Sequence, residues 1–270
     1  MDMNDIAARG MVLLGCGKMG SALLEGWLND GLPTGSIHVL EPRPSDWLTG
    51  TGVSLNGPLP AAPAVALLAV KPQMMGEALP ALQALGGGGT LFVSIAAGTS
   101  LAAIEGSLGA GTPVVRVMPN TPAAVGRGIS ALIGNGFVSA DQLALARDLM
   151  AAVGKTVMLE NEGQMDAVTA VSGSGPAYVF HLIEALAAAG EAEGLPAAMA
   201  MELARATVCG AGELAAQSSE SAAQLRVNVT SPGGTTAAAL GVLMEPETGF
   251  PALLRRAVKA AADRSKELGK

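Results

Sequence analysis

The sequence predicts a doubly wound α/β domain with a parallel sheet, followed by an all-helical domain. Three observations support this fold. Short apolar runs alternate with helix-like segments, a glycine-rich motif follows the first run, and strand signals stop after about Glu160. Strands that alternate with helices form parallel sheets covered on both faces. We place the first domain at residues 1–162 and the second at residues 163–270.

Seven short apolar runs are expected to be buried strands. They are Met11–Leu14, Ile37–Leu40, Val65–Val70, Thr90–Ile95, Val114–Val117, Ile129–Ile133 and Thr156–Leu159. The segments expected to be helices are Ser21–Asn29, Gln73–Leu85, Asp141–Val153, Tyr178–Ala192, Pro196–Ala216, Thr235–Leu243 and Pro251–Leu268. Prolines near helix starts and Gly194 after a helix end mark boundaries in the second domain.

The helices of the second domain carry apolar residues on more than one face, as Leu182, Ile183 and Leu186 illustrate. A helix that is apolar all round is usually buried. A domain of about a hundred residues has too little interior to cover every such face. The pattern therefore predicts at least a homodimer.

Composition narrows the function classes. Half of the 270 residues are hydrophobic and the net charge is -7, which disfavours nucleic-acid binding because that requires a basic surface. The longest uncharged stretch is broken by Pro80 and by four consecutive glycines, so no membrane span is expected. Two cysteines and an N-terminus without a basic and apolar leader predict a soluble, cytoplasmic protein.

A dinucleotide-binding loop is expected between the first strand and the first long helix. Gly15 and Gly17 would form the turn and admit the pyrophosphate, and Gly20 would let helix and strand pack closely. The intervening residues are Cys16, Lys18 and Met19. The pyrophosphate would lie at the helix N-terminus, and the domain would be Rossmann-like.

The residues after the second strand leave open whether the cofactor carries a 2′-phosphate, that is, whether it is NADP or NAD. Glu41 in that place would bind a ribose 2′-hydroxyl and favour NAD, whereas Arg43 would hold the 2′-phosphate of NADP. Further candidates lie near the carboxyl ends of strands, where such sheets bind ligands. They are Asn56, Ala69, Val70, Lys71, Pro72, Ala96 and Ala97.

A candidate anion site opens the helix at Thr235. Two glycines, Gly233 and Gly234, precede this helix and would expose backbone amides to a carboxylate. Ser231 and Thr236 could add hydroxyl donors. An N-cap within a close helix crossing is an equally good explanation of the same pattern.

The residue types that are missing also inform the chemistry. Neither histidine is expected to pair with a catalytic carboxylate, no lysine lies in the helices between Thr156 and Val258, and no His/Cys cluster has metal-ligand spacing. A reductase without a strong acid–base residue suits an electrophile that protonates easily, such as a cyclic imine. Positioning would then supply much of the rate.

With these segments in place, the chain resembles the pyrroline-5-carboxylate reductases over essentially its whole length. The matching segments are Gly15–Gly20, Ala69–Pro72, Arg116–Pro122, Asp166–Thr169, Val171–Tyr178 and Ser231–Thr236. The resemblance implies reduction of L-Δ1-pyrroline-5-carboxylate to L-proline, the last step of proline biosynthesis, normally with NADPH. It also implies a helical domain that interlocks with its partner, often in decamers that are built from such dimers.

The resemblance further implies roles for single residues. Thr236 is the hydroxyl near the ring nitrogen, and the amides around Gly233, Gly234 and Thr235, with Ser231, hold the carboxylate. Glu162 corresponds to an acidic residue close to substrate. Asn56, Asn228 and Lys71 correspond to residues that contact the cofactor.

One departure weakens the expected NADPH preference. Family members often have small or polar residues where this chain has Glu41, Pro42 and Arg43, so NAD also stays possible. Three alternatives to the main function remain: a reductase of another cyclic imine, a reductase of a 2-hydroxy acid, and a non-catalytic dinucleotide sensor. The absent helical lysine disfavours the 2-hydroxy acid, and the intact glycine-rich helix start disfavours the sensor.

Overall fold

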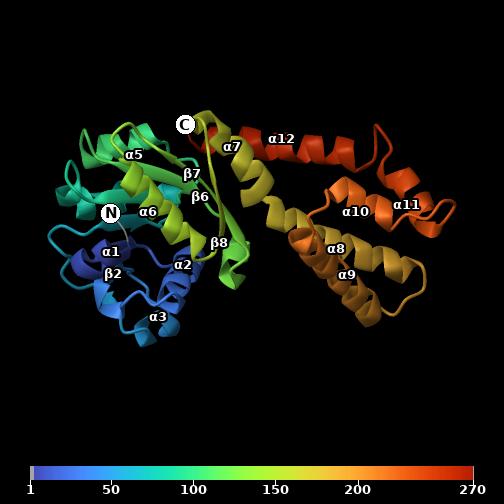
Figure 1. The fold of residues 1–270 in the computed structure, drawn as a ribbon, viewed down its shortest axis with the longest axis horizontal. Coiled ribbons are helices and arrows are strands. Elements are labelled where there is room, and N and C mark those ends of the chain that lie inside the picture. Colours follow the sequence, from blue (N-terminus) through green and yellow to red (C-terminus); the bar gives the residue numbers. More distant parts are fainter. Residues whose placement is uncertain (1–2, 270) are drawn as a thin grey trace. The chain divides into compact units, whose positions relative to one another are not determined.

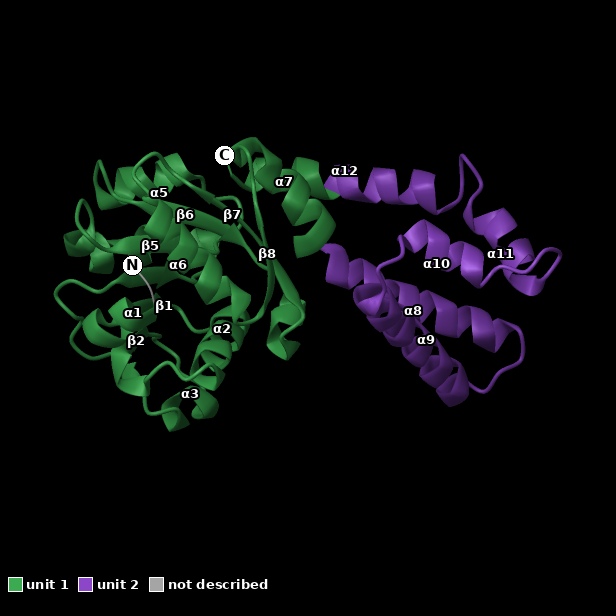
Figure 2. Ribbon diagram, viewed as in Figure 1, with its two compact units in different colours: residues 1–173, 261–270 green, residues 174–260 purple. Residues whose placement is uncertain are grey.

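The computed structural model describes residues 3–269, which form two compact units (Figures 1 and 2). Among these residues, unit 1 comprises 3–173 and 261–269, and unit 2 comprises 174–260. The units differ from the predicted domains by residues 163–173 and by the end of the last helix. Met165 and Ala170 show why the first of these segments belongs with the sheet, since both are buried in unit 1.

An eight-stranded sheet forms the centre of unit 1, with the strand order β3-β2-β1-β4-β5-β6-β7-β8 (Figure 1). Its strands are β1 (Met11–Leu14), β2 (Ile37–Leu40), β3 (Ser54–Leu55), β4 (Val65–Leu68), β5 (Leu91–Ser94), β6 (Val114–Met118), β7 (Gly128–Gly134) and β8 (Gly154–Met158). All seven predicted strands are present within two residues at each end, and the short β3 is additional.

The predicted parallel sheet is confirmed with one exception. β7 pairs with β6 antiparallel, and β8 then runs parallel to β7. The connection from Met118 to Gly128 explains the reversal. It is shorter than the dozen or so residues that a parallel crossover needs.

Helices cover both faces of the sheet, as the alternation predicted. One buried cluster joins the sheet to α1 (Met3–Arg9), α2 (Lys18–Asn29), α3 (Asp46–Gly50) and α6 (Ala140–Ala151). The opposite cluster joins it to α4 (Met75–Ala78), the 3-10 helix η3 (Leu79–Leu85) and α5 (Leu101–Leu108). Alternating residues of one strand face opposite clusters, for example Leu13 and Leu14 of β1.

The predicted helix Gln73–Leu85 is broken in the structure. It consists of the 3-10 helix η2 (Pro72–Met74), then α4, then η3. Pro80 lies at the start of η3, where its missing amide interrupts regular α-helical hydrogen bonding. The break was therefore visible in the sequence.

The segment between β8 and unit 2 consists of short helices: the 3-10 helix η5 (Glu162–Gln164), α7 (Met165–Val168) and the π-helix η6 (Thr169–Gly173). Two further 3-10 helices, η1 (Thr34–Ser36) and η4 (Thr121–Val125), also lie in unit 1. Unit 2 contains α8 (Gly175–Ala192), α9 (Ala197–Gln217), α10 (Ala222–Asn228), α11 (Thr235–Leu243) and the first part of α12 (Phe250–Leu268). Within residues 3–269, no helix is long and apolar enough to span a membrane.

Candidate active site

The first glycine of the predicted dinucleotide loop makes a turn that no other residue could make without strain. Gly15 has a φ of 87°, and its amide donates to the carbonyl of Leu40 at 2.8 Å. A Cβ atom there would lie 2.9 Å from Val70 and 3.0 Å from the backbone of Ala69. Gly15 therefore lets the chain leave β1 directly beside the end of β4.

The other two glycines have different surroundings. A Cβ atom on Gly20 would lie 2.8 Å from the carbonyl oxygen of Gly15, so the close approach of α2 to the loop requires glycine. A Cβ atom on Gly17 would meet no atom of the described residues within 4 Å. Packing thus explains Gly15 and Gly20, whereas the open space beside Gly17 fits the approach of a ligand.

Glu41 is turned toward the glycine-rich loop. Its Oε2 accepts the amide of Cys16 at 2.8 Å, and its Oε1 accepts the amide of Arg43 at 3.0 Å. The carboxylate is therefore fixed beside the loop, in the place where an acidic residue would meet a ribose. The side chain of Arg43 is exposed.

Asn56 holds the backbone of Glu41 from the neighbouring strand connection. Its Oδ1 accepts the amide of Glu41 and its Nδ2 donates to the carbonyl of Glu41, both at 2.9 Å. Asn56 adopts a left-handed conformation with a φ of 52°, which asparagine tolerates better than most residues. The side-chain amide of Asn56 thus holds the backbone of Glu41. The contact with the cofactor that the resemblance implied stays a prediction.

The surroundings of Cys16 favour the neutral form of its thiol. Burial raises the pKa of Cys16, the nearby Glu41 carboxylate raises it further, and a hydrogen bond with Ser21 partly opposes both effects. A protonated thiol adds no negative charge beside a site intended for an anion. Cys16 therefore suits a phosphate-binding loop.

The other candidates of unit 1 gather at the same edge of the sheet. The registers pair Leu14 with Leu40 and with Leu68, and Leu68 with Ser94, so β1, β2, β4 and β5 all end at this edge. The segments that follow these strands include Ala69, Val70, Lys71, Pro72, Ala96 and Ala97. Lys71 is exposed, whereas Ala96 is buried. The loop and the strand ends therefore share one crevice edge.

Glu162, which is partly exposed, pairs with a buried arginine, and the sequence analysis missed this ion pair. Its Oε1 lies 2.7 Å from Nη1 of Arg116, whose side chain is only 7% exposed. The same oxygen accepts the amide of Leu101 at 2.9 Å, at the start of α5. Glu162 thus neutralises a cation within β6 and holds one end of the β5–α5 connection. A single arginine within the apolar run of β6 was the available signal, because a buried cation needs a partner.

The candidate anion site in unit 2 is a turn that opens α11. Gly233 has a φ of 70°, and the amide of Gly234 donates to the carbonyl of Ser231 at 3.0 Å. Gly234 is the N-cap and supplies no side-chain hydrogen bond, so the first amides of α11, at Thr235 and Thr236, receive no bond from the cap and have no partner within the helix. Thr236 is half-buried and Ser231 is exposed.

Asn228 is the last residue of α10, in unit 2, whereas the dinucleotide loop belongs to unit 1. Its Nδ2 donates to Glu220 at 2.9 Å, and its Oδ1 accepts from Gln224 at 2.8 Å. Both polar atoms of its amide are therefore occupied within unit 2. The predicted contact of Asn228 with the cofactor stays a prediction.

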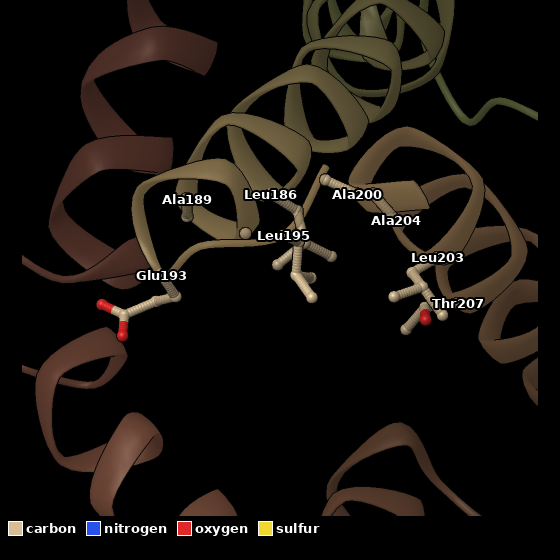
Figure 3. A pocket seen from close by; sticks show the side chains of 9 residues that line it. Leu186, Ala189, Glu193, Leu195, Ala200, Leu203, Ala204 and Thr207 are labelled. Carbon is tan, nitrogen blue, oxygen red and sulfur yellow. The ribbon is translucent and has the colours of Figure 1, made fainter. Parts of the chain in front are cut away.

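The helices of unit 2 expose much of their apolar surface. Its buried hydrophobic residues are only Ala187, Ala200 and Ala204. Large side chains on α8 and α9 stay exposed, among them Phe180 at 59% and Leu203 at 51%. A groove of about 400 Å³ lies between these helices and is lined by apolar side chains such as Leu186 and Leu195 (Figure 3). This surface resembles half of a helical core.

Comparisons with known proteins agree with this arrangement. The family profile described as "Pyrroline-5-carboxylate reductase dimerisation" matches residues 162–268, and the profile described as "NADP oxidoreductase coenzyme F420-dependent" matches residues 11–98. A pyrroline-5-carboxylate reductase of Pseudomonas aeruginosa is 42% identical over 264 residues, covering 96% of each chain.

Solved structures give the same result. The structure of a pyrroline-5-carboxylate reductase from Coxiella burnetii has a TM-score of 0.90 and 35% identity, and the match covers 97% of this chain and 99% of that one. A Plasmodium falciparum pyrroline carboxylate reductase with NADP bound has a TM-score of 0.81 and 30% identity, with 97% and 98% coverage. The predicted fold is confirmed, and the chain belongs to the pyrroline-5-carboxylate reductase family of oxidoreductases.

Proposed function

We propose that this chain reduces L-Δ1-pyrroline-5-carboxylate to L-proline, the last step of proline biosynthesis. Hydride adds to the imine carbon, which is C2 of the pyrroline ring and becomes C5 of proline, and a proton adds to the ring nitrogen, so the C=N double bond becomes a single bond. The observation that carries the proposal is the start of α11, where a turn with two glycines leads into a helix whose N-cap supplies no side-chain hydrogen bond and whose first turn contains Thr236. Membership of the pyrroline-5-carboxylate reductase family suggests that the ligand of these amides is a small imino acid.

The residues of the α11 turn divide the substrate's polar groups between them. The amides of Gly233, Thr235 and Thr236 with the hydroxyl of Ser231 would bind the carboxylate, since helix N-termini favour anions. The hydroxyl of Thr236 would hold the ring nitrogen and donate or relay its proton. Glu162 stays a candidate near substrate, in addition to its bond with Arg116.

The residues of unit 1 fit a reduced nicotinamide dinucleotide, which supplies the hydride when bound. The open space at Gly17 and the N-terminus of α2 would take the pyrophosphate. The backbone from Ala69 to Pro72, with Ala96 and Ala97, would line the nicotinamide half. Lys71, exposed at the carboxyl edge of the sheet, is placed to reach a ribose or phosphate.

We infer that NADPH is the principal donor and that NADH is also accepted. Arg43 would pair with the 2′-phosphate of NADPH, whereas the fixed carboxylate of Glu41 would accept the 2′-hydroxyl of NADH and repel a phosphate. The two side chains therefore act in opposite directions.

Arg43→Ala is expected to lower kcat/KM for NADPH about tenfold relative to NADH, as the loss of one charge-assisted contact predicts. Glu41→Gln is expected to shift the same ratio toward NADPH. Glu25→Gln is a matched control, because Glu25 is exposed on α2 and undergoes the same change of charge. Initial rates with each dinucleotide measure the ratio. Equal effects on both cofactors would remove Arg43 from the 2′-phosphate site.

A pair of glycine substitutions separates binding from folding. Gly17→Ala places a methyl group in open space at a φ of -71°, so stability should hold while the dinucleotide Kd rises at least about tenfold. Gly20→Ala places a methyl group 2.8 Å from the carbonyl oxygen of Gly15, and should cost about 1–3 kcal/mol of stability. Thermal unfolding and calorimetric titration measure the two effects. Normal cofactor binding by Gly17→Ala would place the pyrophosphate elsewhere.

We further propose that two copies pair through the apolar faces of α8 and α9. The apolar side chains of Phe180, Leu186 and Leu203 are exposed, because no other part of unit 2 buries them. The family profile that matches this region describes a dimerisation domain. Both cysteines are free, which suits a reducing compartment such as the cytoplasm. Light scattering on eluted protein would report the mass of the dimer or of a larger assembly of dimers.

An absorbance assay tests the reaction itself. Purified protein is mixed with pyrroline-5-carboxylate and either NADPH or NADH, and oxidation of the nicotinamide is followed. Rapid oxidation with either donor supports the proposal. No oxidation by protein that still binds the cofactor would redirect the search to other cyclic imines, then to 2-hydroxy acids, and last to a sensor without catalysis.

A further inference from the structure

The last turn of α12 lies against the connection between β5 and α5. Residues 261–270 belong to unit 1, although α12 begins in unit 2. A Cβ atom on Gly98 would lie 3.1 Å from the carbonyl oxygen of Leu268, and one on Gly269 would lie 2.7 Å from the carbonyl oxygen of Gly98. The two backbones therefore meet directly, with glycine on each side of the contact.

A buried hydrogen bond fixes the position of this turn. Ser265 is 5% exposed, and its hydroxyl donates to Oδ1 of Asp166 in α7 at 2.6 Å. A hydrogen bond to a carboxylate at this distance is among the strong ones. A shift of α12 by one residue would move it about 1.5 Å along its axis and would break both this bond and the contact at Gly98.

The β5–α5 connection is thus held at two points. Gly98, at its middle, touches the end of α12, and Leu101, at its end, donates its amide to Glu162. The connection also carries Ala96 and Ala97, which the proposed function places beside the nicotinamide. Ordering such a loop before the cofactor arrives removes an entropic cost from binding.

We propose that the end of α12, through Ser265 and the Gly98–Gly269 contact, is a positioning element that holds the β5–α5 connection ready for the dinucleotide. Ser265 and Asp166 are positioning residues in this scheme. They act through the connection and touch neither cofactor nor substrate. The role of the connection rests on the proposed function, whereas the contact itself does not.

Two variants test this proposal independently: Ser265→Ala, and a chain that ends at Lys266. Both are expected to raise the dinucleotide Kd at least fivefold by calorimetry, with a smaller effect on kcat. Both are also expected to speed amide exchange in residues 95–100 while β1 and β4 keep their protection. Ser265→Thr, which retains the hydroxyl, should restore most of the affinity. Ser107→Ala is the matched control, since its hydroxyl bonds only within α5 on the surface.

Two results would overturn the proposal. One is an unchanged Kd and unchanged exchange in both variants. The other is faster exchange spread evenly over unit 1, which would make the end of α12 a general support of the fold. Because Kd and exchange need no substrate, these results are separate from a failure of the protein to reduce pyrroline-5-carboxylate.

Discussion

Thr236→Ala is expected to lower kcat about 10²-fold while the dinucleotide Kd stays unchanged, a magnitude typical of the loss of one proton-transfer group. Thr236 lies in the first turn of α11, in unit 2, whereas the glycine-rich loop belongs to unit 1. Its hydroxyl is needed mainly as the nitrogen gains its proton, so the loss should appear in turnover. Single-turnover kinetics and calorimetric titration of the dinucleotide measure the two quantities.

Two neighbouring substitutions sharpen this result. Thr236→Ser keeps the hydroxyl and should retain most of the activity. Thr235→Ala removes an exposed hydroxyl from the same helix turn and leaves the backbone amide in place, so it should have little effect. An unchanged kcat in Thr236→Ala would exclude this hydroxyl from the mechanism and leave water as the proton source.

Glu162→Ala is expected to lower the free energy of unfolding by about 3 kcal/mol, the lower end of the range for breaking a buried ion pair because Glu162 is partly exposed. The change leaves Arg116, which is 7% exposed, without a counter-charge, and it frees the amide of Leu101. Chemical denaturation followed by circular dichroism measures this loss.

Two further variants separate stability from substrate binding at Glu162. The double variant Arg116→Met with Glu162→Met removes both charges and should recover much of the stability, since the cost lies mainly in the unpaired cation. Glu162→Gln keeps an acceptor for Leu101. If Glu162 also contacts substrate, this variant raises the KM for pyrroline-5-carboxylate while its free energy of unfolding falls less than that of Glu162→Ala. Full stability of Glu162→Ala would contradict a structural role for the pair.

Local signals predicted much of the fold. The strands β1 and β2 and the helix α11 have the predicted bounds, because apolar runs and adjacent glycines or prolines determine them locally. The roles of Gly15 and Gly20 were also predictable, since each depends on the turn between β1 and α2. The exposed apolar faces of unit 2 likewise follow from periodicity alone.

Side-chain contacts between residues far apart in the chain could not be predicted from the sequence. Glu41 bonds with Cys16, 25 residues away, and no local pattern says which way its carboxylate turns. Glu162 and Arg116 are 46 residues apart, and Ser265 and Asp166 are 99 apart. Each of these partnerships depends on how the whole of unit 1 packs, which periodicity does not describe.

The antiparallel direction of β7 was not predicted, for a different reason. Its cause, a connection too short for a parallel crossover, was present in the sequence between Met118 and Gly128. Strand signals alone carry no direction, and the length of the connection supplies it.

Deuterium transfer tests the central claim most directly. The protein is supplied with pyrroline-5-carboxylate and with NADPH or NADH carrying deuterium at nicotinamide C4, in each of the two stereochemical forms, and the product is analysed by mass spectrometry and NMR. The proposed function predicts L-proline with one deuterium at C5 from one of the two forms. Proline without deuterium from both forms, or no proline from protein that binds the cofactor, would contradict direct hydride transfer to the imine carbon.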